Sequence, residues 1–264
     1  MIVLDHVCLS LGERQVLTEV SLRVKPGETM VILGGSGSGK TTILRLMLGL
    51  YRPDRGSIQV AGREISRMQE RELVGVRQNM AMLFQSAALF DSLTVRENVG
   101  YRLWEHGRLS DDQIEHTVQE SLSFVGLADT VDKMPAELSG GMKKRVGIAR
   151  AVASGAQVLL YDEPTAGLDP INTCTIIRLI LRLKRKGVTQ VVVTHDLETA
   201  YQVADRVIML YQGRVVFEGT VEELRRSDHP AVKGFLDPDC LASDNESEAA
   251  RLGRLDRMEA GEMP

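Results

Sequence analysis

Apolar residues recur along the first part of the chain in two spacings, and each spacing predicts a different kind of element. Residues 16–24 alternate apolar and polar positions as a half-buried strand does, whereas residues 29–33 are apolar almost throughout, as in a strand covered on both faces. A glycine-rich segment at 34–39 leads into residues 41–50, where apolar residues lie three and four apart, as on one side of a helix. A strand, a glycine loop and a helix in this order predict the beginning of an α/β fold.

The rest of the chain inserts helices and then returns to strands. Ser110-Asp111-Asp112-Gln113 is a capping-box sequence, and apolar residues at helical spacing follow it. We therefore expect residues from about 94 to 150 to form an inserted α-helical subdomain. A buried strand at 158–161 comes next, then a helix that begins at Asp169-Pro170, and later a hairpin at 207–218.

The composition is that of an ordinary soluble globular protein, with 43% hydrophobic and 26% charged residues. The net charge of -4 provides no overall basic field, which argues against non-specific binding of nucleic acid. The acidic excess is local, because residues 237–264 carry eight acidic and three basic side chains. We expect an acidic extension there. Its Leu252, Leu255 and Met258 either form a short amphipathic helix that docks on a partner or belong to a disordered tail.

The cysteines and the apolar runs bear on the compartment. Cys8, Cys174 and Cys240 are odd in number and far apart, so they fit neither a disulfide framework nor a zinc site, and a reducing compartment is the simplest expectation. The first residues lack the basic start of a signal peptide. No stretch approaches the ~18 apolar residues of a membrane span, so we expect any action at a membrane to go through a partner.

The glycine-rich segment matches a phosphate-binding pattern. The pattern G-x-x-x-x-G-K-[ST] is met by Gly34-Gly35-Ser36-Gly37-Ser38-Gly39-Lys40-Thr41. Glycines let backbone N–H groups turn around a polyphosphate at a helix N-terminus, where Lys40 reaches the phosphates, Thr41 holds Mg²⁺ and Thr42 extends the loop contacts. The alternative is a flexible glycine linker. The strand before the loop and the helix after it favour phosphate binding.

A pair of acidic residues ends the strand at 158–161. Asp162 is a candidate second anchor for Mg²⁺, and Glu163 is a candidate base that polarises an attacking water. An acidic pair at a strand end is by itself usually a solvated turn. Its combination with a phosphate loop in one chain favours the catalytic interpretation.

A second glycine cluster lies at the start of another helix. Leu138-Ser139-Gly140-Gly141-Met142 comes 23 residues before Asp162 and precedes an apolar helix. It is either a plain serine-capped helix start or a second set of N–H groups for a phosphate. We expect the basic run Lys143-Lys144-Arg145 to be a solvated face of that helix.

Two further polar residues have weak signals of their own. His195 follows a buried strand at 191–194, and the carboxyl ends of strands are where α/β sites collect. A lone histidine there is more often structural. Gln85 follows an apolar run and indicates nothing by itself.

The motifs occur in a characteristic order: phosphate loop, Gln85, Leu138–Met142, Asp162-Glu163, Ala166–Asp169 and His195. In this order the chain resembles the ATP-binding subunits of ABC transporters over about residues 1–236. The resemblance implies a P-loop NTPase core of ABC type with an N-terminal antiparallel β subdomain and the inserted helical subdomain. It also implies an ATPase that uses ATP and Mg²⁺ and works as a dimer.

The resemblance assigns roles to the weaker motifs. Gln85 would organise Mg²⁺, sense the γ-phosphate and contact the membrane permease, and His195 would contact the γ-phosphate. Ser139-Gly140-Gly141 would cap ATP held by the second copy of the chain, with Asp169 beside the same interface. Glu163 would polarise water while Lys40 stabilises phosphate charge.

A narrower resemblance is to MlaF-type ATPases of the Mla/MCE phospholipid-transport systems. It is carried by residues 82–92, by Met142 in place of the commoner glutamine, and by Phe235-Leu236-Asp237. It implies a lipid-transporting permease, an MCE-domain lipid-binding protein, and a place at the cytoplasmic face of the inner membrane. The alternatives are an ABC ATPase for another solute or a soluble ABC ATPase acting on nucleic acid. The single core, the near-neutral body and the lack of a heptad run disfavour the latter, so we expect no nucleic-acid partner.

One position departs from the family pattern. Family members usually stack adenine on an aromatic side chain in the early strand region, and by its spacing before the phosphate loop that position is Leu11. Leucine has no ring face to stack on a base, so how the adenine is held is left open.

We expect the affinities for ATP and GTP to lie within about tenfold of each other, because phosphate contacts do not depend on the base. Leu11→Tyr should tighten ATP binding, since base–aromatic stacking is worth ~1–3 kcal/mol. Competitive nucleotide binding at saturating Mg²⁺ measures both. A hundredfold preference for ATP in the wild type would contradict the first expectation, and an unchanged Leu11→Tyr affinity would show that residue 11 does not lie beneath the base.

Overall fold

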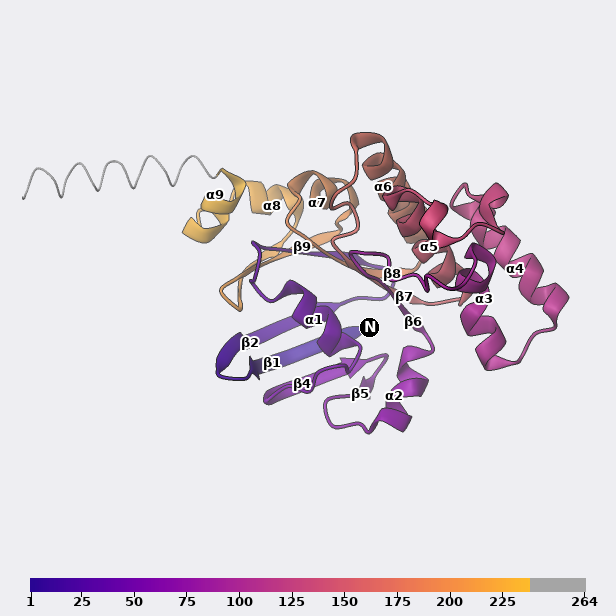
Figure 1. Ribbon diagram of the computed structural model, residues 1–264. Helices are drawn as coiled ribbons and strands as arrows, with labels where there is room; N and C mark the ends of the chain where they lie inside the picture. The colour runs from indigo at the N-terminus through magenta and orange to yellow at the C-terminus, as the bar shows by residue number, and fades with distance from the viewer. Residues whose placement is uncertain (238–264) are drawn as a thin grey trace, which may run out of the picture.

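Two β-sheets organise the part of the chain that the computed structural model describes, residues 1–237 (Figure 1). Residues 238–264, with the hypothetical amphipathic segment at Leu252–Met258, lie outside the described residues. The strands are β1 (Ile2–Leu11), β2 (Arg14–Val24), β3 (Thr29–Leu33), β4 (Arg55–Val60), β5 (Arg63–Glu64), β6 (Met80–Leu83), β7 (Val158–Asp162), β8 (Thr189–Thr194), β9 (Arg206–Tyr211) and β10 (Arg214–Gly219). The α-helices are α1 (Lys40–Met47), α2 (Glu70–Arg77), α3 (Val95–His106), α4 (Asp111–Phe124), α5 (Gly140–Ala153), α6 (Pro170–Arg185), α7 (Leu197–Val203), α8 (Val221–Arg225) and α9 (Pro230–Leu236).

The first sheet is antiparallel and comes mainly from the N-terminal part of the chain. Its order is β2-β1-β4-β5, and β1 pairs with β2 in a long hairpin that places Ile2 opposite Val24. This confirms the expected N-terminal antiparallel sheet. Because alternate residues of β1 and β2 are buried, one face of this sheet contributes to a core.

The second sheet has the order β10-β9-β3-β8-β7-β6, in which all strands except β10 run parallel. The expected strands at 29–33 and 158–161 are confirmed, and the second runs one residue further, through Asp162. The expected hairpin is β9 and β10. Since the central strands are parallel, their carboxyl ends lie along one edge of the sheet, where ligands bind in α/β proteins.

Both faces of the parallel sheet are covered, as its continuous apolar strands require. In β3, Met30 and Ile32 pack into a core shared with the antiparallel sheet and α1, whereas Val31 and Leu33 pack into a core shared with the helices of the opposite face. All four side chains are fully buried. The α/β architecture expected from the sequence is therefore confirmed.

Helix α1 ends earlier than the sequence pattern suggests. The expected helix reached residue 50, but α1 ends at Met47 because Gly49 takes a left-handed conformation with φ of 66°. The Leu50 N–H then donates to the Arg45 carbonyl at 2.9 Å, which closes the helix with the hydrogen bond typical of a Schellman motif.

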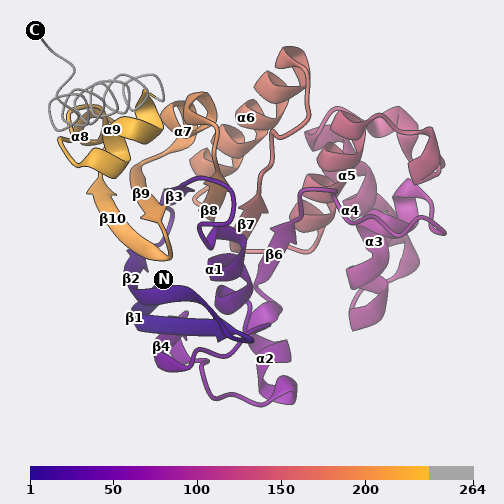
Figure 2. The ribbon, with the colours of Figure 1, turned by 60° about the vertical axis from the view of Figure 1, so that its left-hand side comes forward.

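Helices α3, α4 and α5 lie in the segment expected to form a helical subdomain, and α5 extends three residues past position 150. They gather to one side of the two sheets in both ribbon views (Figure 2). Ser110 caps α4 and Gln113 completes the capping box, and Asp169 caps α6, as their sequences predict. No helix within residues 1–237 is long and apolar enough to cross a membrane.

Candidate functional site

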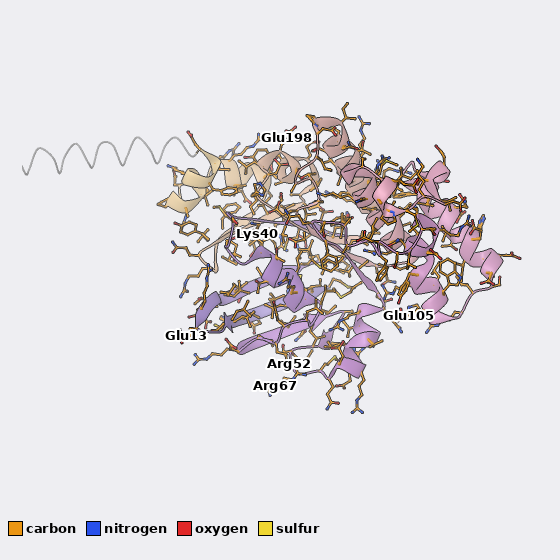
Figure 3. The ribbon with its side chains drawn as sticks, in the orientation of Figure 1. Glu13, Lys40, Arg52, Arg67, Glu105 and Glu198 are labelled. Carbon is orange, nitrogen blue, oxygen red and sulfur yellow. The ribbon has the colours of Figure 1, made fainter. Side chains whose placement is uncertain are left out.

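The glycine loop lies between the end of β3 and the start of α1, and the α1 segment that begins with Lys40 lies between the two sheets (Figure 3). Gly39 needs to be glycine for two reasons. Its φ is 106°, and a Cβ there would come within 2.7 Å of the Leu17 side chain and 3.3 Å of the Val16 carbonyl. The β1–β2 hairpin is thus packed against the loop, which fixes the loop's shape before any ligand arrives.

Lys40 is folded into the loop that precedes it. Its Nζ donates to the carbonyls of Gly34 at 2.7 Å and Gly35 at 3.0 Å, and it lies 3.7 Å from Oε1 of Glu163. Burial lowers the pKa of Lys40, and the negative charge of Glu163 opposes that shift. These contacts hold the ammonium inside the loop, where it is placed to bind an anion that enters the loop.

Thr41 and Asp162 form the part of the site suited to a cation. The Thr41 hydroxyl donates to Oδ1 of Asp162 at 2.8 Å. Burial raises the pKa of Asp162, and the hydrogen bond from Thr41 opposes the shift. The buried hydroxyl of Ser38, in the same loop, has no hydrogen-bond partner. Hydroxyl and carboxylate oxygens are the ligands that Mg²⁺ prefers, so the donor set fits this ion.

A second acidic side chain, Glu163, lies at the same edge of the sheet. Its Oε2 accepts a hydrogen bond from the Thr194 hydroxyl at 3.1 Å and lies 3.0 Å from Nδ1 of His195. The Glu163 backbone has a φ of 49°, and its N–H donates to the Val193 carbonyl at 2.9 Å. Only 13% of its side chain is exposed, against 63% for His195. The last residue of β8, Thr194, and the residue after it, His195, therefore hold the Glu163 carboxylate, which faces Lys40.

These side chains surround a pocket of about 810 Å³. Its lining includes most of the residues that the sequence singles out: Leu11, Gly35, Ser36, Gly37, Ser38, Gly39, Lys40, Thr41, Thr42, Gln85, Glu163 and His195. Gly34 and Asp162 are not part of the lining but bond to two residues that are, Lys40 and Thr41. The arrangement can bind a polyphosphate with a divalent cation and present a carboxylate to water.

Sequence reasoning missed four lining residues: Arg14, Val16, Gly234 and Phe235. The first two belong to the hairpin, and the last two to α9, almost two hundred residues beyond the loop. Phe235 is conspicuous in the sequence only as part of the run Phe235-Leu236-Asp237, which carries no signal for a pocket.

The remaining predicted site residues form a separate group that does not line this pocket. Ser139 and Gly140 are exposed at the N-terminus of α5, and Asp169 is exposed at the N-terminus of α6. The two helix starts adjoin, because a Cβ on Gly141 would come within 2.5 Å of the Asn172 side-chain oxygen, and Asn172 donates its N–H to Asp169 at 2.9 Å. Within one chain, this second group and the pocket are distinct surfaces.

The interpretation of the basic run after this group as a solvated face is wrong for Lys144. Lys144 is 5% exposed, and its Nζ donates to the backbone carbonyls of Glu163 at 3.2 Å and Ala166 at 2.7 Å. Burial lowers its pKa. A run of three basic residues gives no indication that one of them points inward, which depends on how α5 packs on the segment after β7.

Comparisons with known proteins agree with this geometry. The family profile of the ABC transporter matches residues 17–166. The methionine import ATP-binding protein MetN of Carboxydothermus hydrogenoformans is 44% identical over 85% of this chain and 68% of its own length. The intermembrane phospholipid transport system ATP-binding protein MlaF of Escherichia coli is 40% identical over 88% of this chain and 86% of its own length.

A solved structure gives the same fold. A dimeric ATP-binding cassette in a post-hydrolysis state, bound to ADP and Pi, is 33% identical to this chain and superposes with a TM-score of 0.77. The match covers 84% of this chain and 99% of that one. The sequence and the fold therefore point to the same family.

Thr41→Val keeps the shape of the side chain and removes the oxygen offered to Mg²⁺. We expect the gain in ATP affinity that Mg²⁺ provides to fall by about tenfold or more, while affinity measured in EDTA stays unchanged. Titration calorimetry with and without Mg²⁺ makes the comparison. Thr117→Val is the control, because that hydroxyl bonds only the Gln113 carbonyl on α4. An equal loss in EDTA would mean that Thr41 supports the loop rather than the ion.

Proposed function

This chain belongs to the ABC transporter family as an ATP-hydrolysing subunit, and we propose that it powers phospholipid movement through a membrane permease. The observation that carries the lipid assignment is the match to MlaF, which is 40% identical and extends over 86% of that protein's length. MetN is slightly more identical, but the match covers only 68% of its length. Met142 adds support, because it stands where the signature more commonly has glutamine and MlaF-type ATPases share this methionine.

We infer the following division of labour in the pocket. Lys40 and the N–H groups of the loop bind the β- and γ-phosphates, because the Lys40 ammonium already lies inside the loop. Glu163 accepts the proton of the attacking water, and His195, 3.0 Å from the carboxylate, contacts the γ-phosphate. The Thr194 hydroxyl donates a hydrogen bond to the Glu163 carboxylate and keeps that side chain oriented.

Thr41, Asp162 and Gln85 are the proposed holders of Mg²⁺. When bound, the ion would neutralise charge that develops on the transferred phosphoryl group. Asp162 is buried and accepts the hydrogen bond of the Thr41 hydroxyl, so the two oxygens lie side by side. Gln85 is exposed and lines the pocket from the segment after β6.

The second group of site residues supports a homodimer. Ser139, Gly140 and Asp169 are exposed at two adjoining helix starts that do not line the chain's own pocket. N–H groups at a helix N-terminus suit a phosphate. We propose that they close over ATP in the pocket of a second copy, so that each site is completed only in the dimer. The related cassette of known structure is itself dimeric.

The proposed docking place for the permease is a cleft beside Gln85 whose lining combines apolar side chains with Arg77, Arg102, Glu105 and Arg150. The cleft has a volume of about 410 Å³ and is lined by residues of β6, α3 and α5. Its rim carries Phe90 and Tyr101, each 45% exposed, with ring centroids 4.8 Å apart. Large exposed aromatics mark interaction surfaces. Phe84 lines the cleft and the next residue, Gln85, lines the ATP pocket, so one short segment joins the two.

The complete proposal places the ATPase on the cytoplasmic face of the inner membrane, held there by the permease, with an MCE-domain lipid-binding protein as a further subunit. An ABC ATPase for another solute is the second candidate, and the similarity to MetN is the observation that favours it.

Glu163→Gln keeps the shape of the side chain and removes its basicity. We expect ATP binding to persist while turnover falls by at least about 10²-fold, the lower range for a general base, with a closed dimer accumulating. The rate of ATP turnover and the fraction of dimer in size-exclusion chromatography with ATP test this expectation. Glu198→Gln is the control, since Glu198 is exposed on α7 (Figure 3). Turnover above about a tenth of the wild-type value would remove Glu163 from the proposed role.

The docking proposal predicts which proteins copurify with the ATPase from membranes. Tyr101→Ser should reduce recovery of the membrane subunits by about tenfold, because it removes an exposed ring from the cleft rim, and should leave nucleotide affinity unchanged. Leu109→Ser is the matched control, since Leu109 is 39% exposed in the same helical segment but does not line the cleft.

The identity of the copurified proteins and lipid decides between the two candidate functions. A permease with an MCE-domain protein and bound phospholipid, identified by mass spectrometry, is the expected result. A permease with a solute-binding protein and no phospholipid would favour the second candidate. Equal recovery with both serine variants would place the docking surface elsewhere.

A further inference from the structure

The pocket has a charged side and an apolar side, as a nucleoside triphosphate does. Lys40, Glu163 and His195 lie where β3, β7 and β8 end. The only apolar side chains that line the pocket in residues 1–237 are Leu11 and Val16 of the β1–β2 hairpin and Phe235 of α9. A base carries no charge and is planar, so it belongs with these three side chains rather than with the phosphate ligands.

The β1–β2 hairpin packs against the part of the phosphate loop that contains Gly37 and Gly39. A Cβ on Gly37 would come within 3.9 Å of the Arg14 guanidinium, and one on Gly39 would meet Leu17 and Val16. Lys40 instead faces Glu163, 3.7 Å away. The hairpin side of the pocket is therefore the one that points away from the reacting phosphate.

Neither hairpin residue has an aromatic ring. Leu11 is 41% exposed, so its apolar surface is available to a purine, but it has no ring to stack on the base. Val16 is smaller and partly buried. Among the three apolar side chains that line the pocket in the described residues, Phe235 alone has a planar face, and a base stacks on such a face whatever its identity.

Helix α9 is anchored well enough to hold a ring in place. Val232 is fully buried in the core that covers one face of the parallel sheet, and the partly buried Phe235 packs against the same core. His229 caps the helix by accepting the Ala231 N–H at 3.2 Å, and Lys233 pairs with Asp228 at 2.7 Å. Gly234, next to the ring, also lines the pocket and has no side chain to obstruct a ligand.

We propose that Phe235 is the base-stacking residue of this ATPase, so that the C-terminal helix supplies the ring that the early strand position lacks. The inference rests on the proposed nucleotide site and adds a specificity-determining residue to it. Stacking does not distinguish adenine from guanine, and it acts on ATP in the same subunit.

The test compares ATP with inorganic tripolyphosphate, which has the phosphates but no base. Phe235→Leu keeps an apolar side chain for packing and removes the ring, and it should weaken ATP binding about 5- to 100-fold while changing tripolyphosphate affinity less than twofold. Phe235→Trp should keep ATP affinity within about threefold of the wild type. Leu236→Ala is the control, because Leu236 packs against the same core but does not line the pocket.

Four results would overturn the inference. ATP affinity unchanged in Phe235→Leu would mean that the ring does not touch the base. Equal weakening of ATP and tripolyphosphate, or of Phe235→Leu and Leu236→Ala, would mean that α9 only supports the fold of the pocket. A wild-type protein that binds neither ligand would overturn the nucleotide site itself, and the tripolyphosphate measurement separates that failure from the others.

Discussion

The parallel register of β3, β7 and β8 is the constraint on which the site depends. Leu33 pairs with Thr194, and Asp162 pairs with Val193, so the three strands end side by side. Each end leads into a different polar segment, and the edge therefore collects the phosphate loop, the acidic pair and the histidine. A shift of one residue would turn the acidic side chains to the wrong face, since successive side chains alternate across a sheet.

The site holds charges that its surroundings do not favour. Burial lowers the pKa of Lys40 and raises that of Asp162, and each shift is opposed by neighbours of the pocket. Burial of an ionisable group is unfavourable when the group loses its hydration and gains too few hydrogen bonds or opposite charges in exchange. Such groups therefore often mark places where a ligand supplies the remaining interactions. The proposed ligand, a polyphosphate with Mg²⁺, would bring an anion to Lys40 and a cation to Asp162.

Two long-range contacts join this edge to the rest of the molecule. Lys144 of α5 donates to the carbonyl of Glu163, which ties the helix that begins with the second glycine cluster to the segment after β7. Phe235 brings helix α9 to the lining of the same pocket. The pocket is thus connected to segments that lie far from the phosphate loop in the sequence.

The sequence alone was enough for the elements and motifs whose chemistry is local. The phosphate loop, the strand at Thr29–Leu33, the caps at Ser110 and Asp169 and the acidic pair all follow from short spacings, because each depends on residues a few positions apart. The end of α1 was the exception, since a single left-handed glycine outweighed the apolar pattern. Only the tertiary structure decided that Lys144 points inward, that Ser139 and Asp169 lie outside the chain's own pocket, and that Phe235 lines it. These facts depend on which distant segments pack together, and the spacing of neighbouring residues shows which face of an element is buried but not which segment covers it.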